Sequence, residues 1–395
     1  MSAQPRRYVR SGVVLNVIII VAGLIGIATL LLSQMGSDSG STSTRLALGL
    51  TALTDGLDHP VVLTGDGAGG RYVGQADGIV LALASDGTAG ADPFLDIHDD
   101  LASGTGLLGL AFHPDFVDDG RLYVSYIRAE DQAISISEFR AVDGSVDDRS
   151  ERPILVIPRT DGSPRAASLA FDPSGMLLIG VGGAEAEPAA AAPDPAALAG
   201  ALLRIDVDHG MPYAIPGDNG FAGQSGARGE LHAIGLREPA HMSIDRDTGS
   251  VYVGDAGSGE QEIDVLTPGS HAASFGWPEM DGDDCRPGGA CDPAAYITPA
   301  VTYPIGGTDG ACGVVGGYAY RGTAGSLPPG TYVFADRCGA LWSVSAASLQ
   351  EGRVTPAEAG RVPASAGHVL GFGEDDAGEL YLLTDSGTVY AIAES

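Results

Sequence analysis

Short apolar runs, joined in pairs by turns rich in Gly, Pro and Asp, recur along most of this chain. The clearest pair is Gly106–Phe116, GLLGLAFHPDF, followed by Gly120–Ser125, GRLYVS. Asp, Gly or Pro between two strand-like runs is the pattern of a β-hairpin. Related units occur at Leu169–Gly180, Met242–Gly254 and Val369–Leu383, with weaker copies at Val62–Gly74 and Tyr318–Phe334.

Six hairpins in series predict an all-β fold, a six-bladed β-propeller in which each hairpin belongs to one blade. Recognisable long amphipathic helices are absent, and Gly is abundant, with 59 residues. Closed all-β folds also run large as single domains. We therefore expect one propeller domain, whose loops meet at a common face where a ligand site can form.

The beginning of the chain differs, because Val13–Leu32 is an apolar run without charge. About 20 such residues span a bilayer as a helix. Arg6, Arg7 and Arg10 precede the run and acidic residues predominate after it, so the positive-inside rule places the N-terminus in the cytoplasm. A cleaved signal peptide is the alternative.

These features predict four regions: a cytoplasmic N-terminus at 1–12, a transmembrane anchor at 13–33, a linker at 34–50 and the propeller at 51–395. The expected location is a bacterial cell membrane, crossed once, with the C-terminal domain outside the cytoplasm. The formal net charge is −30, and all 21 basic residues are Arg. Nucleic-acid binding is excluded by this balance, because contact with phosphates needs a basic surface.

The four cysteines all lie in the region expected to be exported, and an even count there favours disulfides. Cys285 and Cys291 bracket a short Pro/Gly loop, whereas Cys312 and Cys338 flank the hairpin around Tyr318–Phe334. We predict these two pairings. A zinc site is disfavoured, since no CxxC motif occurs.

Several motifs follow one another along the chain: Gly106–Phe116 with Gly120–Ser125, Leu202–Val207 (LLRIDV), Gly235–Pro239 (GLREP), Glu262–Asp264 (EID), Phe275–Pro278 (FGWP), Gly316–Gly322 (GGYAYRG) and Tyr332–Cys338 (YVFADRC). In this order they resemble one family, the soluble PQQ-dependent sugar dehydrogenases, or glucose/sorbosone and aldose sugar dehydrogenases. The resemblance runs from about Leu57 to Ile392 and agrees with the predicted propeller.

The resemblance implies oxidation of aldose sugars at the anomeric carbon, with PQQ as electron acceptor and Ca²⁺ polarising the quinone. A histidine would serve as general base. By the same resemblance, the cofactor-binding residues would be Arg237, Gly257, Phe275, Gly317 and Arg321, and the metal ligands would be Asp255 and Glu262.

The chain departs from the family pattern where the catalytic base is expected. Aligning Pro164–Phe171, PRAASLAF, on its last three residues places Pro164 at the histidine position, and no His occurs between His113 and His209. The low-complexity segment Ala184–Ala199 lies where the family has a polar loop, and its Glu185 or Glu187 is the alternative base.

The family's GLRNP motif is GLREP here, so Glu238 adds a negative charge beside Arg237. Like charges would weaken the binding of a PQQ tricarboxylate. Two functions therefore stay open. One is an exported, membrane-anchored sugar dehydrogenase with a rearranged site. The other is a catalytically impaired propeller that binds a sugar, a glycan or a protein partner at the cell surface.

Overall fold

A computed structural model describes residues 46–102, 106–159, 166–183, 193–270, 272–287, 291–306, 311–362 and 366–395. They belong to one compact unit, Leu46–Ser395. The apolar run Val13–Leu32 lies outside the described residues, so the predicted anchor and linker stay predictions. No helix within these described ranges is long and apolar enough to cross a membrane.

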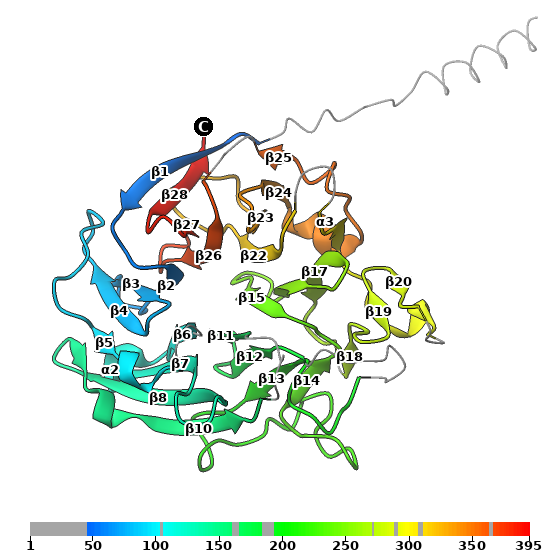
Figure 1. Cartoon of the computed structure of the whole chain (residues 1–395), viewed down its shortest axis with the longest axis horizontal. Coiled ribbons are helices and arrows are strands. Elements are labelled where there is room, and N and C mark those ends of the chain that lie inside the picture. Colours follow the sequence, from blue (N-terminus) through cyan, green and yellow to red (C-terminus); the bar gives the residue numbers. More distant parts are fainter. Residues whose placement is uncertain are drawn as a thin grey trace, which may run out of the picture. The chain divides into compact units, whose positions relative to one another are not determined.

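The compact unit consists of antiparallel sheets arranged around a common centre, which is the arrangement of a β-propeller (Figure 1). Each four- or five-stranded sheet has its first strand at the centre, and the following strands lie progressively outward; the eight-stranded sheet has two central strands, β2 and β26. Helices are few among the described residues: α2 (Phe116–Asp119), α3 (Ala346–Glu351) and the short 3-10 turns η1 (His98–Asp100), η2 (Asp148–Ser150) and η3 (Pro293–Ala295).

Three of the sheets come from the middle of the chain. The first holds β6 (Leu107–Phe112), β7 (Arg121–Ile127), β8 (Ile134–Val142) and β10 (Arg152–Ile157), with β9 (Ser145–Val146) beside β8. The second holds β11 (Ala167–Phe171), β12 (Leu177–Val181), β13 (Ala201–Ile205), β14 (Leu231–Ile234) and β18 (Ala273–Ser274). The third holds β15 (Pro239–Ile244), β16 (Val251–Ala256), β17 (Glu260–Leu266) and β21 (Val301–Pro304).

The remaining strands complete the ring. One sheet holds β22 (Val314–Ala319), β23 (Thr331–Asp336), β24 (Leu341–Ser345) and β25 (Arg361–Val362), and β19 (Met280–Asp281) pairs with β20 (Asp284–Cys285). An eight-stranded sheet joins β2 (Pro60–Gly65), β3 (Arg71–Gln75), β4 (Ile79–Leu83) and β5 (Leu95–Asp96) to β26 (Val369–Glu374), β27 (Leu380–Thr384), β28 (Val389–Glu394) and β1 (Leu48–Thr54).

Two strand pairs bring the ends of the compact unit together. β1 pairs antiparallel with β28, so that Leu48 lies opposite Glu394. β2 pairs parallel with β26, so that Leu63 lies opposite Gly373. The first strand of the unit thus covers the outer edge of β28, an edge that would otherwise expose unpaired backbone groups.

All six hairpins predicted from the sequence are formed: β2/β3, β6/β7, β11/β12, β15/β16, β22/β23 and β26/β27. The first strand of each hairpin lies on the inner side of the ring (Figure 1). The apolar face of each sheet packs against the next sheet. Between the β11–β14 sheet and the β15–β17 sheet, for example, Leu236, Val253 and Phe275 belong to one buried cluster.

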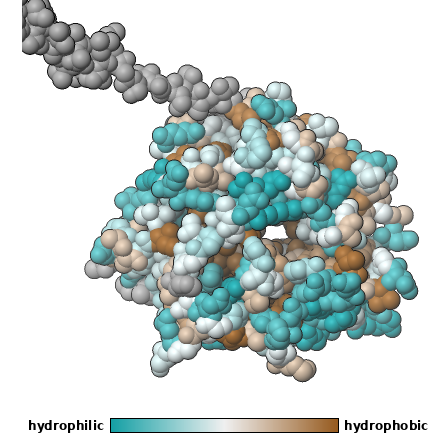
Figure 2. Space-filling model, turned by 180° about the vertical axis from the view of Figure 1, so that it is seen from behind, coloured by the Kyte–Doolittle hydropathy of each residue, from teal (hydrophilic) through white to brown (hydrophobic). Residues whose placement is uncertain are grey.

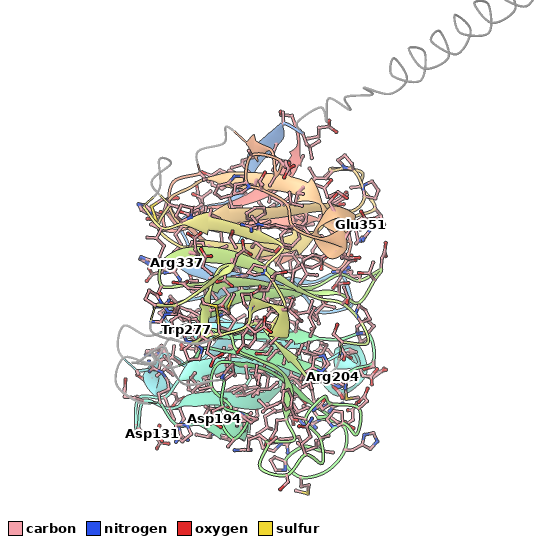
Figure 3. The ribbon with its side chains drawn as sticks, turned by 90° about the vertical axis from the view of Figure 1, so that its right-hand side faces the viewer. Asp131, Asp194, Arg204, Trp277, Arg337 and Glu351 are labelled. Carbon is pink, nitrogen blue, oxygen red and sulfur yellow. A yellow bond between two sulfur atoms is a disulfide. The ribbon has the colours of Figure 1, made fainter. Side chains whose placement is uncertain are left out.

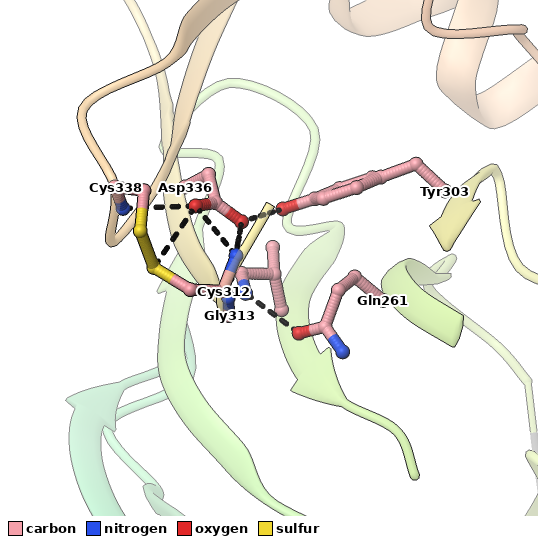
Figure 4. Close-up of a disulfide and its surroundings, with 7 residues drawn as sticks. Gln261, Tyr303, Cys312, Gly313, Asp336 and Cys338 are labelled. Carbon is pink, nitrogen blue, oxygen red and sulfur yellow. Dashed lines mark hydrogen bonds between the residues drawn. A yellow bond between two sulfur atoms is a disulfide. The ribbon is translucent and has the colours of Figure 1, made fainter. Parts of the chain in front are cut away.

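Both predicted disulfides, Cys285–Cys291 and Cys312–Cys338, are confirmed. The second lies beside the fully buried Asp336 at the end of β23 (Figure 4). The Asp336 carboxylate accepts hydrogen bonds from the backbone N–H groups of Cys312, Gly313 and Cys338 and from the Tyr303 hydroxyl. The disulfide and this carboxylate together fix the start of β22 to the end of β23.

The two disulfides should contribute unequally to stability. Cys312–Cys338 spans 26 residues and Cys285–Cys291 spans 6. In the chain-entropy model, replacing the first pair by Ser lowers the free energy of unfolding by about 3.5 kcal/mol, against about 2 kcal/mol for the second pair. Urea denaturation of the full chain, with the Cys285→Ser/Cys291→Ser double variant as the matched control, measures both. An equal or reversed order would contradict the prediction.

Candidate functional site

The GLREP segment forms a tight turn that packs against the FGWP segment. Gly235 has a φ of +82°, and a Cβ placed there would lie 2.6 Å from the Gly276 nitrogen. The turn is fixed by two backbone hydrogen bonds, from Trp277 N–H to Gly235 O (3.0 Å) and from Phe275 N–H to Ile234 O (2.9 Å). Glycine is thus required at position 235 for both its conformation and its close contact.

Asp255, the penultimate residue of β16, holds this turn in place. Its buried carboxylate accepts hydrogen bonds from the backbone N–H groups of Arg237 (2.8 Å) and Glu238 (2.5 Å). Burial raises the pKa of Asp255 to about 6, and the two N–H donors oppose that rise. The carboxylate therefore anchors the start of β15 to the end of β16.

The Arg237 side chain points toward the backbone that follows β16. Its Nη1 donates to Ala256 O (2.6 Å) and Gly257 O (3.1 Å), and lies 3.8 Å from a Glu238 carboxylate oxygen. The guanidinium carbon lies 5.4 Å from the centre of the Trp277 ring. The Arg237 guanidinium thus contacts two backbone carbonyls, a carboxylate and an indole ring, all of this chain.

Three buried carboxylates lie on one face of the β16/β17 hairpin. Glu262 lies directly opposite Asp255 in the strand register, and Asp264 follows two residues later on the same face. One carboxylate oxygen from each lies within 4.8 Å of the others. Burial, together with neighbouring carboxylates, raises the pKa values of Glu262 and Asp264 well above their usual range.

Hydrogen bonding satisfies these carboxylates unequally. Glu262 Oε1 accepts from the Gly282 N–H (2.6 Å). Asp264 is fully buried, and neither of its oxygens has a hydrogen-bond partner among the described residues. Val253, opposite Asp264, belongs to the apolar cluster between two sheets. A charged carboxylate in such surroundings is strongly unfavourable unless a cation or a proton compensates it.

The carboxylate cluster fits a hard divalent cation. Ca²⁺ prefers several oxygen ligands, with carboxylates foremost, and Asp264 offers two oxygens without hydrogen bonds. The structure brings together the two predicted metal residues, Asp255 and Glu262, and adds Asp264, which the sequence analysis did not assign. The signal was present in Glu262–Asp264, because acids two residues apart on a strand share a face.

The described residues fit PQQ less well than they fit a divalent cation. PQQ carries three carboxylates and needs cationic partners, whereas this cluster holds Glu238, Asp255, Glu262 and Asp264 against Arg237. Arg237 Nη1 already donates to two backbone carbonyls. The segments 103–105, 160–165 and 184–192 lie outside the described residues, and they include Pro164, Glu185 and Glu187.

Of the other predicted cofactor residues, Gly257 follows β16, Phe275 follows β18 and Gly317 lies within β22. The Gly257 carbonyl lies at the Arg237 side chain. Phe275 is buried in the cluster between sheets. Gly317 lies within β22, and its carbonyl accepts from Ser243 Oγ (2.6 Å).

Arg321 does not lie with Arg237 and the three buried carboxylates. It donates to Asp245, which follows β15 at the end opposite to Asp255. Because an innermost strand runs from one face of the propeller to the other, residues beyond its two ends lie far apart. Figure 3 shows the two faces, with Trp277 and Arg337 along one side and Arg204 and Glu351 along the other.

Known proteins support the family resemblance. The model of the glucose/sorbosone dehydrogenase family matches residues 57–390. The Hedgehog-interacting protein of mouse is 28% identical over 84% of this chain and 49% of its own length. An aldose sugar dehydrogenase of Escherichia coli is 28% identical over 57% of this chain and 60% of its own length. The chain thus spans about half the length of the Hedgehog-interacting proteins it matches.

Solved structures show the same fold at low identity. A putative glucose dehydrogenase of Thermus thermophilus aligns with a TM-score of 0.69 at 22% identity, over 88% of this chain and 100% of that one. PQQ-bound aldose sugar dehydrogenase of Streptomyces coelicolor aligns with a TM-score of 0.63 at 18% identity, over 88% and 98%. The family match covers most of the compact unit, and the chain belongs to the glucose/sorbosone dehydrogenase family.

Proposed function

We propose that this chain is a cell-surface binding propeller that keeps the cation site but not the PQQ chemistry of its family. The observation that carries the proposal is the charge balance at the GLREP turn. Arg237 lies beside Glu238 and donates to the carbonyls of Ala256 and Gly257. Three buried carboxylates lie behind it. An anionic cofactor would meet net repulsion there.

Proton removal supports the same conclusion. Sugar oxidation needs a base within hydrogen-bond reach of the reacting hydroxyl. Pro164 occupies the aligned histidine position. His241 is the histidine nearest in sequence to the GLREP turn, and its Nε2 accepts from the Phe372 N–H (3.3 Å). Burial lowers the pKa of His241 to about 4, so its ring is neutral at neutral pH and its Nε2 lone pair is already engaged.

The proposed ligand is a protein with a basic surface. Phe275 and Trp277, the aromatic residues of the site, are only 3% and 8% exposed, so they offer little surface on which a sugar could stack. The formal net charge of −30 favours a cationic partner. Two relatives, whose matches cover 84% and 85% of this chain, are named for interaction with Hedgehog.

We also propose that this propeller has six blades. The eight-stranded sheet divides at the parallel β2/β26 pair into β2–β5 and a second group of β26–β28 with β1. Each group then contains one innermost strand and one predicted hairpin. We further propose that Val13–Leu32 anchors the chain in the membrane, with the propeller outside the cytoplasm.

The first prediction concerns PQQ. Addition of PQQ and Ca²⁺ to the full chain in mild detergent should leave the quinone absorbance unchanged, and dye-linked aldose oxidation should stay far below 10 s⁻¹, roughly the median enzyme turnover. Glu238→Asn should improve PQQ binding, because it removes a like charge, while the exposed Glu130→Gln should change nothing. Turnover of roughly 10 s⁻¹ by the unmodified protein would overturn the proposal.

The second prediction concerns the partner. A membrane-impermeant cross-linker applied to intact cells should capture the full-length chain in the membrane fraction, joined to a basic protein. The affinity of the purified pair should fall steeply between about 0.1 M and about 1 M salt, since the Debye screening length shortens from about 10 Å to about 3 Å. Salt-independent binding would contradict the charged interface.

The same cells test the anchor. A mature protein that begins after about residue 35, found free in the medium, would contradict the proposed membrane anchor.

The third prediction concerns the cation. At a Ca²⁺ concentration about 100 times its dissociation constant, the full chain should gain about 2.7 kcal/mol of stability. In chelator, stability should fall as the pH rises from about 4 through 6 and beyond, because the folded-state pKa of Asp255 is raised to about 6 and those of Glu262 and Asp264 are raised further. Ca²⁺ should abolish that loss.

Asp264→Asn tests the same site without a large change in volume. The variant should be at least as stable as the unmodified protein in chelator, because it removes a buried charge, and should gain less from Ca²⁺. Glu130→Gln, an exposed change, is the control. Thermal unfolding in Ca²⁺ and in chelator measures both effects. A Ca²⁺-independent melting temperature in the unmodified protein would refute the cation site.

A further inference from the structure

Two side chains of the β15 region reach across β22 to β26. His241 accepts the Phe372 N–H. Arg246, just beyond β15, donates to the backbone carbonyls of Asp375 (2.5 Å) and Asp376 (3.0 Å). β22 permits the first contact because Gly316 lacks a side chain, and a Cβ there would lie 2.9 Å from the His241 Cβ. These contacts link two innermost strands that are not neighbours in the ring.

A cavity of about 220 Å³ lies among the innermost strands, at the end where Arg246 follows β15, and Arg246 is one of its lining residues. All six strands β2, β6, β11, β15, β22 and β26 contribute to its lining. β6 and β11 supply apolar side chains, among them Leu169 and Phe171. Thr64, Tyr318 and Glu374 supply polar groups from β2, β22 and β26. Figure 2 shows an opening near the centre of one face, bordered on one side by hydrophilic residues.

Glu374 is the polar centre of this cavity. Its side chain is 10% exposed, and one carboxylate oxygen pairs with Arg246 Nε at 3.0 Å. Among the described residues, its other oxygen, Oε1, has no hydrogen bond or ion pair. The Arg246 guanidinium is already shared with two backbone carbonyls. Asp376 also lines the cavity, so two carboxylates face the single cation Arg246. With Glu374 ionised, the lining therefore keeps a net negative charge.

Further acidic groups increase the negative potential around Glu374. Asp375 follows it, and Asp245 lies beyond β15, where it pairs with Arg321. Tyr318 faces it from β22, while β6 and β11 contribute apolar residues. Burial raises the pKa of Glu374 to about 7, with Arg246 opposing and Asp375 and Asp245 adding to the rise.

We propose that this cavity binds a small organic monocation: a primary amine with an apolar body about the size of an aromatic ring. An ammonium group has three donors and no acceptor. Carboxylate, phenol and hydroxyl oxygens of Glu374, Tyr318 and Thr64 are acceptors of the matching kind. Leu169 and Phe171 offer the apolar wall against which the body of the ligand packs.

The size of the cavity supports this ligand class. An apolar protein cavity of about 150 Å³ accommodates benzene. At about 220 Å³ the present cavity has room for an aromatic ring with an aminomethyl group. The site lies at the Asp245 end of the innermost strands, and the GLREP turn lies at the other end. The proposal is therefore independent of the function proposed for the GLREP face.

Benzylamine is the probe, with benzyl alcohol and benzoate as its neutral and anionic analogues. Isothermal titration of the full chain in nonionic detergent should show saturable benzylamine binding at pH 8 that weakens at pH 6, where Glu374 is protonated. Both analogues should bind at least tenfold more weakly. Glu374→Gln should weaken benzylamine binding at least tenfold, whereas Glu351→Gln, on the same face, should have no effect.

Ile244→Trp provides a second variant, which fills the cavity and leaves Glu374 in place. It should abolish binding, and the thermal unfolding of each variant shows whether it is folded. Absence of benzylamine binding to the unmodified protein at concentrations on the order of 10 mM would overturn the proposal. Equal binding of benzyl alcohol, or undiminished binding to folded Glu374→Gln or Ile244→Trp, would overturn it as well.

Discussion

The hydrogen bonds from the backbone of Arg237 and Glu238 to the Asp255 carboxylate hold the GLREP turn, and the geometry of the candidate site depends on them. They fix the start of β15 at the end of β16. This position directs the Arg237 guanidinium at the carbonyls of Ala256 and Gly257. Asp255 thus links the GLREP turn to the buried carboxylates, so a change in its ionisation would alter the hydrogen bonds that hold this turn.

Two buried aspartates illustrate opposite solutions to the cost of desolvation. Asp336 at the end of β23 accepts from three backbone N–H groups and a tyrosine hydroxyl, so it is satisfied by the protein alone. Asp264 has no such donors among the described residues, and two further carboxylates lie close to it. The Asp336 carboxylate therefore needs no partner beyond the protein. The charge of the Asp264 carboxylate must be compensated by a cation or removed by protonation.

Local patterns predicted much of this structure, because hairpins and short disulfide loops are determined by residues close in sequence. The turns at His113–Asp115 and Asp172–Gly175 fall where the sequence places them, between paired strands. The location of Arg321 could not be derived from its motif, because a motif gives proximity in sequence, whereas the location depends on which end of β22 the residue follows. The link from β15 to β26 could not be foreseen, since it depends on Gly316 allowing His241 across an intervening strand.

The pairing of β1 with β28 has a mechanical consequence. Tension applied to the chain at Leu46 reaches β1 before any other strand, and β1 is the outermost strand of its sheet. Its register with β28 runs from Leu48 to Thr54, so only one ladder of backbone hydrogen bonds bears the load at first. Rupture of that ladder would expose the outer edge of β28 while leaving the β2/β26 pair in place. A propeller pulled from this end would therefore unfold in steps, and β1 would detach first.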